Sequence, residues 1–98
     1  ARINEFYGIR EEPGKVKFAA LYPKADQVQL AGDFNNWQPE QTPLLKADED
    51  GRWEIELPLS GGTYQYRYVV DGRWQPDPYN KRVSINPFGE YNSLLEVK

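Results

Sequence analysis

Apolar and polar residues alternate in several short stretches of the chain. In residues 52–57 the apolar side chains, Trp53 among them, fall on one face of an extended segment and the charged ones on the other. Residues 64–70, 16–22 and 28–30 show the same alternation. A period of two is typical of β-strands, and no stretch has apolar residues at helical spacing beyond two turns. These segments are therefore expected to be strands, with Trp53 in the core.

Turn-forming pairs separate these segments. Asp-Gly occurs at residues 50–51 and 71–72, and Gly-Gly at 61–62. Such pairs tolerate the positive φ values that tight hairpin turns require. A last strand is expected at residues 93–97. Short strands separated by turns at about 8–12-residue spacing are typical of an antiparallel sandwich. The sequence thus predicts a single all-β domain over residues 1–98, with no linker or internal repeat.

Composition excludes several functions. The chain has 98 residues, no Cys and no His, and a net charge of −3. It therefore has no disulfide, no thiolate or imidazole metal site, and no Ser-His-Asp chemistry. The negative charge argues against a nucleic-acid partner. The longest apolar run, residues 18–22, is far shorter than the ~20 residues that cross a membrane, so the expected location is cytoplasmic. The first residue, Ala1, is compatible with loss of an initiating Met and favours a complete small protein.

Aromatic residues make up 14% of the chain, more rings than so small a core absorbs, so some are expected at the surface. Residues 32–37 place Trp37 beyond an Asn-rich turn, where it is either displayed or closes the rim of the sandwich. In residues 66–74, Arg67 and Trp74 share a face on the outer side of a hairpin. Each also has a plainer interpretation: a solvated charge for Arg67, and a partly buried ring for Trp74.

Two further loops carry rings and polar groups. Residues 77–80 begin Asp-Pro, which ends a strand, and Asp77 is expected to fix that turn. Residues 87–92 place two rings and an amide just before the last strand, although Tyr91 could equally belong to the core. Exposed rings beside amide and guanidinium groups suit a sugar. The apolar face of a pyranose stacks on an indole, and its hydroxyl groups bond to Asn and Arg.

These motifs resemble a known family. The match runs from Val28 to Val97, and it is carried by Leu-Ala-Gly-Asp-Phe-Asn-Asn-Trp at 30–37 and by Tyr-Gln-Tyr-Arg-Tyr-Val-Val-Asp-Gly-Arg-Trp at 64–74. Asp-Pro at 77–78 and Asn92 follow. The chain is similar to the glycogen-binding domain of the AMP-activated protein kinase β-subunit. More broadly, it resembles the family-48 carbohydrate-binding modules of isoamylases and glycogen-branching enzymes.

The resemblance implies an immunoglobulin-like, early-set antiparallel β-sandwich that binds α-1,4-glucan without a cofactor or metal. The expected ligands are glycogen, starch and malto-oligosaccharides. Trp37 and Trp74 match the family's two sugar-stacking tryptophans, and Asn92 matches its hydroxyl-bonding Asn. The first fifteen residues, 1–15, add little to the match and are expected to be an N-terminal extension or edge strand, with residues 6–9 as the candidate strand.

Three positions depart from the kinase domain. Arg67 stands in place of a sugar-bonding Lys, which keeps the charge and adds a planar donor fork. Phe88 replaces a Leu that passes through the ring of a cyclic glucan. Glu90 replaces a hydroxyl residue at the rim, where a carboxylate still accepts a bond from a sugar hydroxyl. The carbohydrate-binding residues implied by the resemblance are therefore Trp37, Arg67, Trp74, Phe88, Glu90 and Asn92.

Two other functions compete with glucan binding. The domain could dock on a glucan-metabolising enzyme or a kinase and keep only a vestigial sugar site. It could also be a small glycosidase, because hydrolysis needs two carboxylates about 5–10 Å apart and the chain offers Asp33, Asp71, Asp77 and Glu90. Turn chemistry explains the three Asp residues, and an open sandwich face does not enclose a general acid. The sequence therefore predicts a binding module that is not an enzyme.

Overall fold

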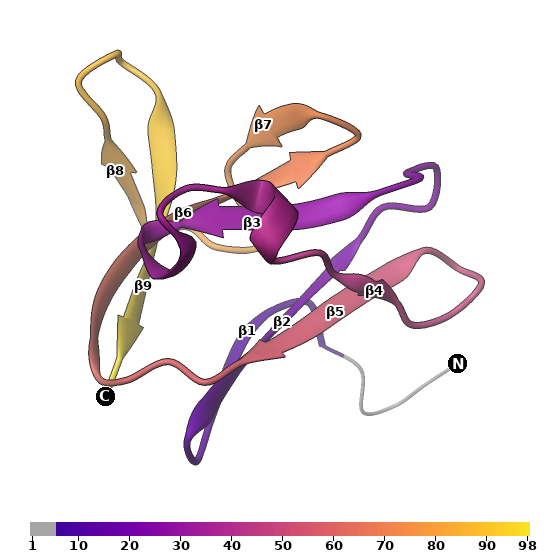
Figure 1. The fold of residues 1–98 in the computed structure, drawn as a ribbon, viewed down its shortest axis with the longest axis horizontal. Coiled ribbons are helices and arrows are strands. Elements are labelled where there is room, and N and C mark those ends of the chain that lie inside the picture. Colours follow the sequence, from indigo (N-terminus) through magenta and orange to yellow (C-terminus); the bar gives the residue numbers. More distant parts are fainter. Residues whose placement is uncertain (1–5) are drawn as a thin grey trace.

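The computed structural model describes residues 6–98, so the first five residues of the expected N-terminal extension lie outside the described residues. Nine strands within residues 6–98 form two antiparallel sheets that pack into a sandwich (Figure 1). The predicted all-β antiparallel sandwich is confirmed. No helix within these residues has the length and apolar character that a bilayer crossing requires.

Each sheet collects strands from distant parts of the chain. The first sheet has the order β1-β2-β5-β4, formed by β1 (Gly8–Glu12), β2 (Lys15–Leu21), β5 (Arg52–Leu57) and β4 (Leu45–Lys46). The second sheet has the order β3-β6-β9-β8, formed by β3 (Val28–Gly32), β6 (Gly62–Val70), β9 (Tyr91–Val97) and β8 (Val83–Ile85). A short strand, β7 (Arg73–Gln75), also pairs with β6. Two 3₁₀ turns, η1 (Asp33–Asn35) and η2 (Pro39–Gln41), follow β3.

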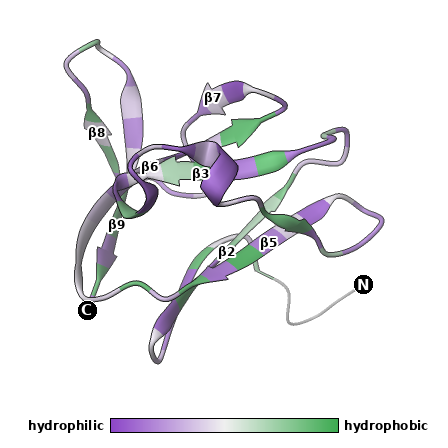
Figure 2. Ribbon diagram, in the orientation of Figure 1, coloured by the Kyte–Doolittle hydropathy of each residue, from purple (hydrophilic) through white to green (hydrophobic). Residues whose placement is uncertain are grey.

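The core lies between the sheets. Phe18 from β2, Leu30 from β3, and Tyr66 and Tyr68 from β6 are fully buried there, and Trp53 is 6% exposed. The ring of Phe18 meets the ring of Tyr66 edge to face at 5.3 Å. Green and purple segments along the strands in Figure 2 show the change between apolar and polar positions. The alternation in the sequence therefore located both the core rings and the strands that carry them.

Two details of the fold differ from the sequence expectation. The Gly-Gly pair at residues 61–62 is not a hairpin turn, because the chain there crosses from β5 in the first sheet to β6 in the second. Arg52 was assigned to a charged outer face, yet it is only 5% exposed. Its guanidinium lies 5.5 Å from the ring centroid of Phe6 and donates to the Phe6 carbonyl oxygen at 3.2 Å. The N-terminal segment thus covers Arg52.

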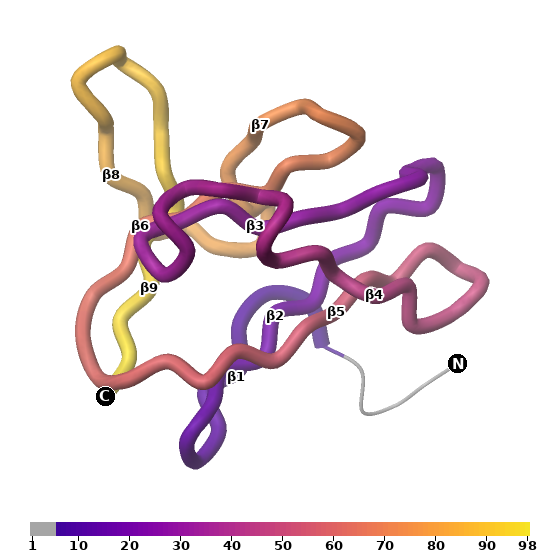
Figure 3. Tube along the Cα trace, viewed as in Figure 1, coloured from indigo at the N-terminus to yellow at the C-terminus, as the bar shows by residue number. Residues whose placement is uncertain are grey.

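Strand β6 changes partner along one of its edges. Residues 62–66 pair with β9, and residues 68–70 pair with β7. Arg67 lies at the change, while its other edge pairs with Ala31 of β3. The β6–β7 and β8–β9 hairpins therefore both depend on the same edge of β6, and both rise on one side of the molecule (Figure 3). The two hairpins therefore pair with β6 on either side of Arg67.

Candidate functional site

The residues expected to bind sugar lie on the outer face of the second sheet. Because Tyr66 and Tyr68 point into the core, the side chains of the intervening β6 residues, Arg67 among them, point outward. Trp74 on β7 pairs directly with Val69 on β6, which faces the same way as Arg67. Ser93 on β9 pairs with the core residue Tyr66, so the adjacent Asn92 points outward. Strand pairing alone thus brings Arg67, Trp74 and Asn92 to one face.

The turn at residues 32–37 carries Trp37 to the same face. Gly32 is required there, because a Cβ would lie 2.6 Å from the Gln65 carbonyl oxygen and 2.8 Å from Cβ of Tyr66. Asn35 is buried, and its side-chain amide donates to the Leu30 carbonyl oxygen at 2.9 Å. Its side-chain oxygen accepts from the Gly32 N–H at 3.1 Å. The side chain of Asn35 therefore fixes the turn that ends β3.

Trp37 is held in an unusual backbone conformation. Asn36 and Trp37 have φ values of 56° and 59°, the left-handed region, which costs a non-glycine residue about 1–2 kcal/mol. The Trp37 N–H donates to the Gly32 carbonyl oxygen at 2.9 Å, and its indole Nε1–H donates to Asp33 Oδ1 at 3.0 Å. Backbone strain of this kind is found where a structure positions a functional group. Here it orients a single indole ring.

Asp33 connects that indole to the sheet. Its other carboxylate oxygen, Oδ2, accepts from the Gln65 backbone N–H at 2.8 Å. Pairing between β3 and β6 ends at Gly32 and Tyr66, so Asp33 adds one hydrogen bond where β3 has no further residue to supply it. The carboxylate of Asp33 therefore fixes the indole of Trp37 relative to β6.

The β6–β7 hairpin presents Trp74. Its turn residues Asp71 and Gly72 have φ values of 50° and 82°, the positive values that a tight two-residue hairpin needs. Trp74 is 42% exposed. Its carbonyl oxygen accepts from the Arg67 guanidinium at 3.2 Å. The guanidinium thus lies at the base of Trp74, and its side chain is only 12% exposed.

The loop between β8 and β9 forms the opposite wall. The Asn86 side-chain oxygen accepts from the backbone N–H groups of Phe88 and Glu90 at 2.9 and 3.0 Å, and the Asn86 N–H donates to the Glu90 carbonyl oxygen. Phe88 is left 86% exposed at the tip. The Glu90 carboxylate lies 3.7 Å from the Arg67 guanidinium. Asn86 therefore shapes the loop that carries one exposed ring and one carboxylate.

These parts surround one open hollow of about 470 Å³. Its lining consists of Trp37, Arg67, Trp74, Asn86, Phe88, Glu90 and Asn92. All six residues that the resemblance implied are present, and Asn86 is the addition. Asn92 is 7% exposed and donates to the Gln65 side-chain oxygen at 3.0 Å. Its own side-chain oxygen and Nε of Arg67 are buried with no hydrogen-bond partner among residues 6–98.

A buried polar cluster supports the hollow from the core side. The Tyr66 hydroxyl donates to Asp77 Oδ2 at 2.6 Å, and the Asp77 N–H donates to the Ser93 hydroxyl at 2.7 Å. Burial raises the pKa of Asp77, and the bond from Tyr66 opposes that rise. Asp77 follows Trp74 by three residues, and Ser93 adjoins Asn92. The cluster therefore fixes the distance between the two walls, in addition to the turn that the sequence predicted for Asp77.

Sequence reasoning missed Asn86, Gln65 and the role of Asp33. Nothing in the local sequence shows that Gln65 supports Asn92. Asp33 was assigned to turn chemistry, whereas its partners are the Trp37 indole and a strand 32 positions away. A signal was available for Asn86 alone, because an Asn before Pro commonly begins a turn.

A sandwich whose outer face displays rings, amides and a guanidinium around an open hollow is built as a carbohydrate-binding module. The family described as the glycogen recognition site of AMP-activated protein kinase matches residues 17–98. The chain belongs to this family of glycogen-recognition domains, and its class is that of non-catalytic glucan-binding modules.

Individual relatives show the same family in larger proteins. The chain is 35% identical over 78 residues to the 1,4-alpha-glucan branching enzyme GlgB of Nitrosomonas eutropha, a match that covers 72% of this chain and 10% of the relative. It is 38% identical over 72 residues to the human 5'-AMP-activated protein kinase subunit beta-2, a match that covers 74% of this chain and 25% of the relative. It is 36% identical over 73 residues to the protein FLOURY ENDOSPERM 6, chloroplastic, of Oryza sativa subsp. japonica, a match that covers 74% of this chain and 13% of the relative. The match thus spans a quarter or less of the length of these relatives.

Proposed function

We propose that the hollow on the second sheet binds a short stretch of α-1,4-glucan and that the domain does no chemistry on it. The observation that carries this proposal is the convergence of Trp37, Trp74, Phe88, Arg67, Asn92 and Glu90 around one hollow. The indole rings of Trp37 and Trp74 stack on the apolar faces of glucose units. Arg67 donates to sugar hydroxyl groups, and Asn92 both donates and accepts.

The carboxylates support a binding role over hydrolysis. Within residues 6–98, Glu90 is the one carboxylate that lines the hollow. Asp33 is bonded to Trp37 and Gln65, Asp71 accepts from two backbone N–H groups, and Asp77 is buried beneath the sheet. Glycoside hydrolysis needs a second carboxylate across the sugar. The lining thus suits recognition of a glucan and not its cleavage.

Binding at a single hollow of this kind is weak. Each sugar hydroxyl exchanges a bond to water for one to protein, and the net gain per bond is small. We expect a dissociation constant of about 1 μM to 1 mM, with glycogen and starch bound more firmly through many equivalent chains.

The test is retardation in a native gel that contains glycogen. The parent protein should be retarded, and the Trp37→Ala/Trp74→Ala double variant should migrate as in a gel without glycogen. A Lys15→Ala/Lys17→Ala double variant on the first sheet is the matched control and should be retarded like the parent. Retardation of the tryptophan double variant would show that the glucan binds elsewhere.

The relatives also support a second, subordinate role, in which this domain brings a larger glucan-metabolising enzyme or a kinase to its substrate. They are a branching enzyme and a kinase subunit in which the match occupies a limited part. This role does not compete with glucan binding, since the second sheet's outer face is kept for sugar. The cytoplasmic location stays a prediction from the sequence. Co-purification of the tagged chain with one such enzyme, unchanged by added maltoheptaose, is the result expected of a separate docking face.

A further inference from the structure

We propose that Glu90 makes the hollow selective for uncharged glucan and that it rejects glucans carrying phosphate monoesters. The inference rests on the proposed function, because it concerns which glucans the same hollow accepts. It assigns to Glu90 a role in specificity, beyond that of accepting a bond from a sugar hydroxyl.

The first step concerns the charges that line the hollow. Its cation is Arg67 and its carboxylate is Glu90, while the other lining residues are aromatic or amide side chains. The Arg67 guanidinium lies 3.7 Å from the Glu90 carboxylate. The pair makes the lining electrically neutral, although each partner keeps hydrogen-bonding capacity for a hydroxyl group. A neutral sugar therefore meets donors and acceptors without a net field.

The second step concerns how firmly this carboxylate is placed. The Asn86 side-chain oxygen accepts from the backbone N–H of Glu90, and the Asn86 N–H donates to its carbonyl oxygen at 2.8 Å. Both backbone polar groups of Glu90, its N–H and its carbonyl oxygen, are thus bonded to Asn86, whereas its side chain is 57% exposed. A carboxylate at this position meets an incoming ligand before the ligand reaches Arg67, whose side chain is 12% exposed.

The third step concerns what an anionic ligand would find. A phosphate monoester carries a charge of about −1.5 to −2 near neutral pH. It is repelled by Glu90, and Arg67 is already paired with Glu90 and bonded to the Trp74 carbonyl oxygen. A second carboxylate, Asp33, accepts from the Trp37 indole N–H at 3.0 Å and adds to the repulsion. Two charges a few ångströms apart near a protein surface interact by enough to change affinity about three- to ten-fold.

The experiment compares maltoheptaose with the same oligosaccharide carrying one phosphate monoester on a glucose 6-hydroxyl, by isothermal titration at low salt. The parent should bind the phosphorylated sugar about three- to ten-fold more weakly. In Glu90→Gln, which keeps the side-chain shape and an acceptor oxygen, this ratio should fall to about one or invert, because Arg67 is released to pair with phosphate. The same variant is also titrated with plain maltoheptaose, so that the readout is the ratio of the two affinities and any loss of the Glu90 contact common to both sugars cancels.

The matched control is Glu56→Gln, which makes the same charge change on the outer face of the first sheet, where Glu56 pairs with Lys15. It should leave the ratio of the two affinities at the parent value. Equal affinities in the parent, or the parent ratio retained in Glu90→Gln, would overturn the proposal. So would an equal change in Glu56→Gln, since the effect would then come from net charge. Absence of maltoheptaose binding in the parent would instead overturn the proposed function.

Discussion

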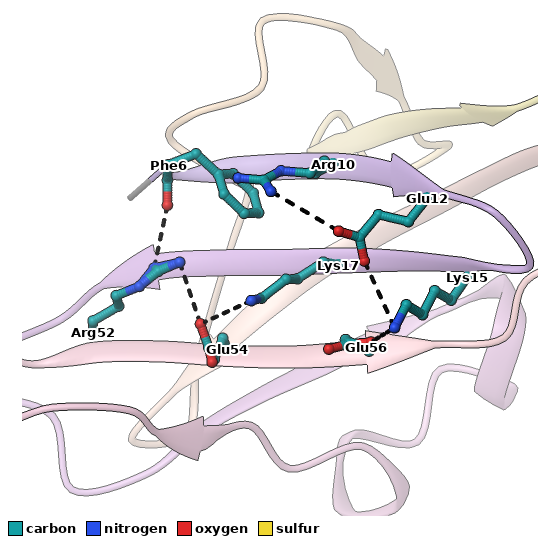
Figure 4. A network of polar contacts seen from close by, with 8 residues as sticks. All are labelled: Phe6, Arg10, Glu12, Lys15, Lys17, Arg52, Glu54 and Glu56. Carbon is teal, nitrogen blue, oxygen red and sulfur yellow. Dashed lines mark hydrogen bonds and ion pairs between the residues drawn. The ribbon is translucent and has the colours of Figure 1, made fainter. Parts of the chain in front are cut away.

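The two outer faces of the sandwich differ in how many charged side chains they carry and in how those side chains are paired. On the first sheet, the charges pair with one another: Lys15 with Glu12 and Glu56, Lys17 and Arg52 with Glu54, and Arg10 with Glu12 (Figure 4). On the second sheet, one guanidinium and one carboxylate stand among three rings and two amides. The first face satisfies its own polar groups, whereas the second leaves an Asn92 oxygen and an Arg67 nitrogen without partners among the described residues.

The difference shows what each face is suited to meet. A face whose cations and anions are interleaved across neighbouring strands is well hydrated, and its exposed pairs each contribute little to stability. A face with exposed rings and unused hydrogen-bonding groups costs solubility unless a ligand covers it. Among the rings exposed within the described residues, Trp74 and Phe88 border the hollow, whereas Tyr7 and Tyr79 stack on one another. The contrast therefore supports the proposed site on the second sheet.

The largest expected effect comes from alkaline pH, which acts on the core beneath both faces. Burial raises the pKa of Tyr66 and of Tyr68, and the nearby Asp77 carboxylate raises both further. The folded state then keeps phenolic protons that the unfolded chain loses above pH 10, so stability falls as pH rises. Each buried tyrosine contributes up to about 1.4 kcal/mol per pH unit. Burial also raises the pKa of Tyr22 to about 12, and this partly exposed residue adds a smaller share. Urea unfolding should show a loss of about 5–6 kcal/mol between pH 10 and pH 12.

Tyr68→Phe separates the two tyrosines. The Tyr68 hydroxyl is buried with no hydrogen-bond partner among residues 6–98, so this variant should be as stable as the parent at pH 7. It should keep somewhat more than half of the alkaline loss, because Tyr66 and Tyr22 still contribute. A variant with the full alkaline loss would contradict the assignment of the pH dependence to Tyr68. Because the sheets share one core, glucan retention should disappear together with the fold in both proteins.

Replacing one arginine on each sheet with alanine tests whether the two faces are independent. Arg52→Ala removes a buried guanidinium that bonds to the Phe6 carbonyl oxygen and to Glu54 at 3.2 Å. It should lower the free energy of unfolding by about 2 kcal/mol and leave glucan affinity unchanged. Arg67→Ala should weaken maltoheptaose binding about tenfold and lower stability by less than about 1 kcal/mol. Urea unfolding gives the free energy of unfolding of each variant, and calorimetric titration gives its affinity for maltoheptaose. Loss of affinity in Arg52→Ala would show that the faces are coupled.

The smallest expected effect concerns Asp33, which supports the ligand face without lining it. Asp33→Ala should weaken maltoheptaose binding about three- to five-fold, because the Trp37 ring loses the acceptor that orients it. Asp33→Asn keeps one acceptor oxygen and should recover part of the affinity. The indole N–H of Trp37, followed by NMR, should exchange with solvent faster in Asp33→Ala than in the parent. Unchanged exchange would mean that Asp33 acts on the fold alone.

The sequence predicted most of the core and less of the connections. Alternation in residues 52–57 and 64–70 identified β5 and β6, because each of these strands has one face in a single apolar layer. The last strand begins at Tyr91, two residues earlier than expected, and Tyr91, for which the sequence left a loop and a core position both open, is 50% exposed. The two-residue β4 has no detectable period. The crossing at residues 61–62 depends on which sheet β6 joins, and local turn chemistry does not carry that information.

The residues that line the hollow were predictable from the sequence, but the hydrogen bonds that position them were not. The family motifs carried the six lining residues, while the contacts that position them join distant segments. Asp33 reaches Gln65, Arg67 reaches the Trp74 carbonyl oxygen, and Asn92 reaches Gln65. Arg52 was misplaced for the same reason, since its cover comes from residues near the N-terminus that show no pattern linking them to β5. The period of two predicts which face of the sheet a side chain lies on, but not which other segment of the chain covers it.

The change of partner along β6 has a mechanical consequence. The β6–β7 and β8–β9 hairpins are tied to β6 at separate places along one edge, on either side of Arg67. A glucan that touches both Trp74 and Asn92 contacts both hairpins. A sugar bound there would join the two hairpins across Arg67 and limit their motion relative to one another.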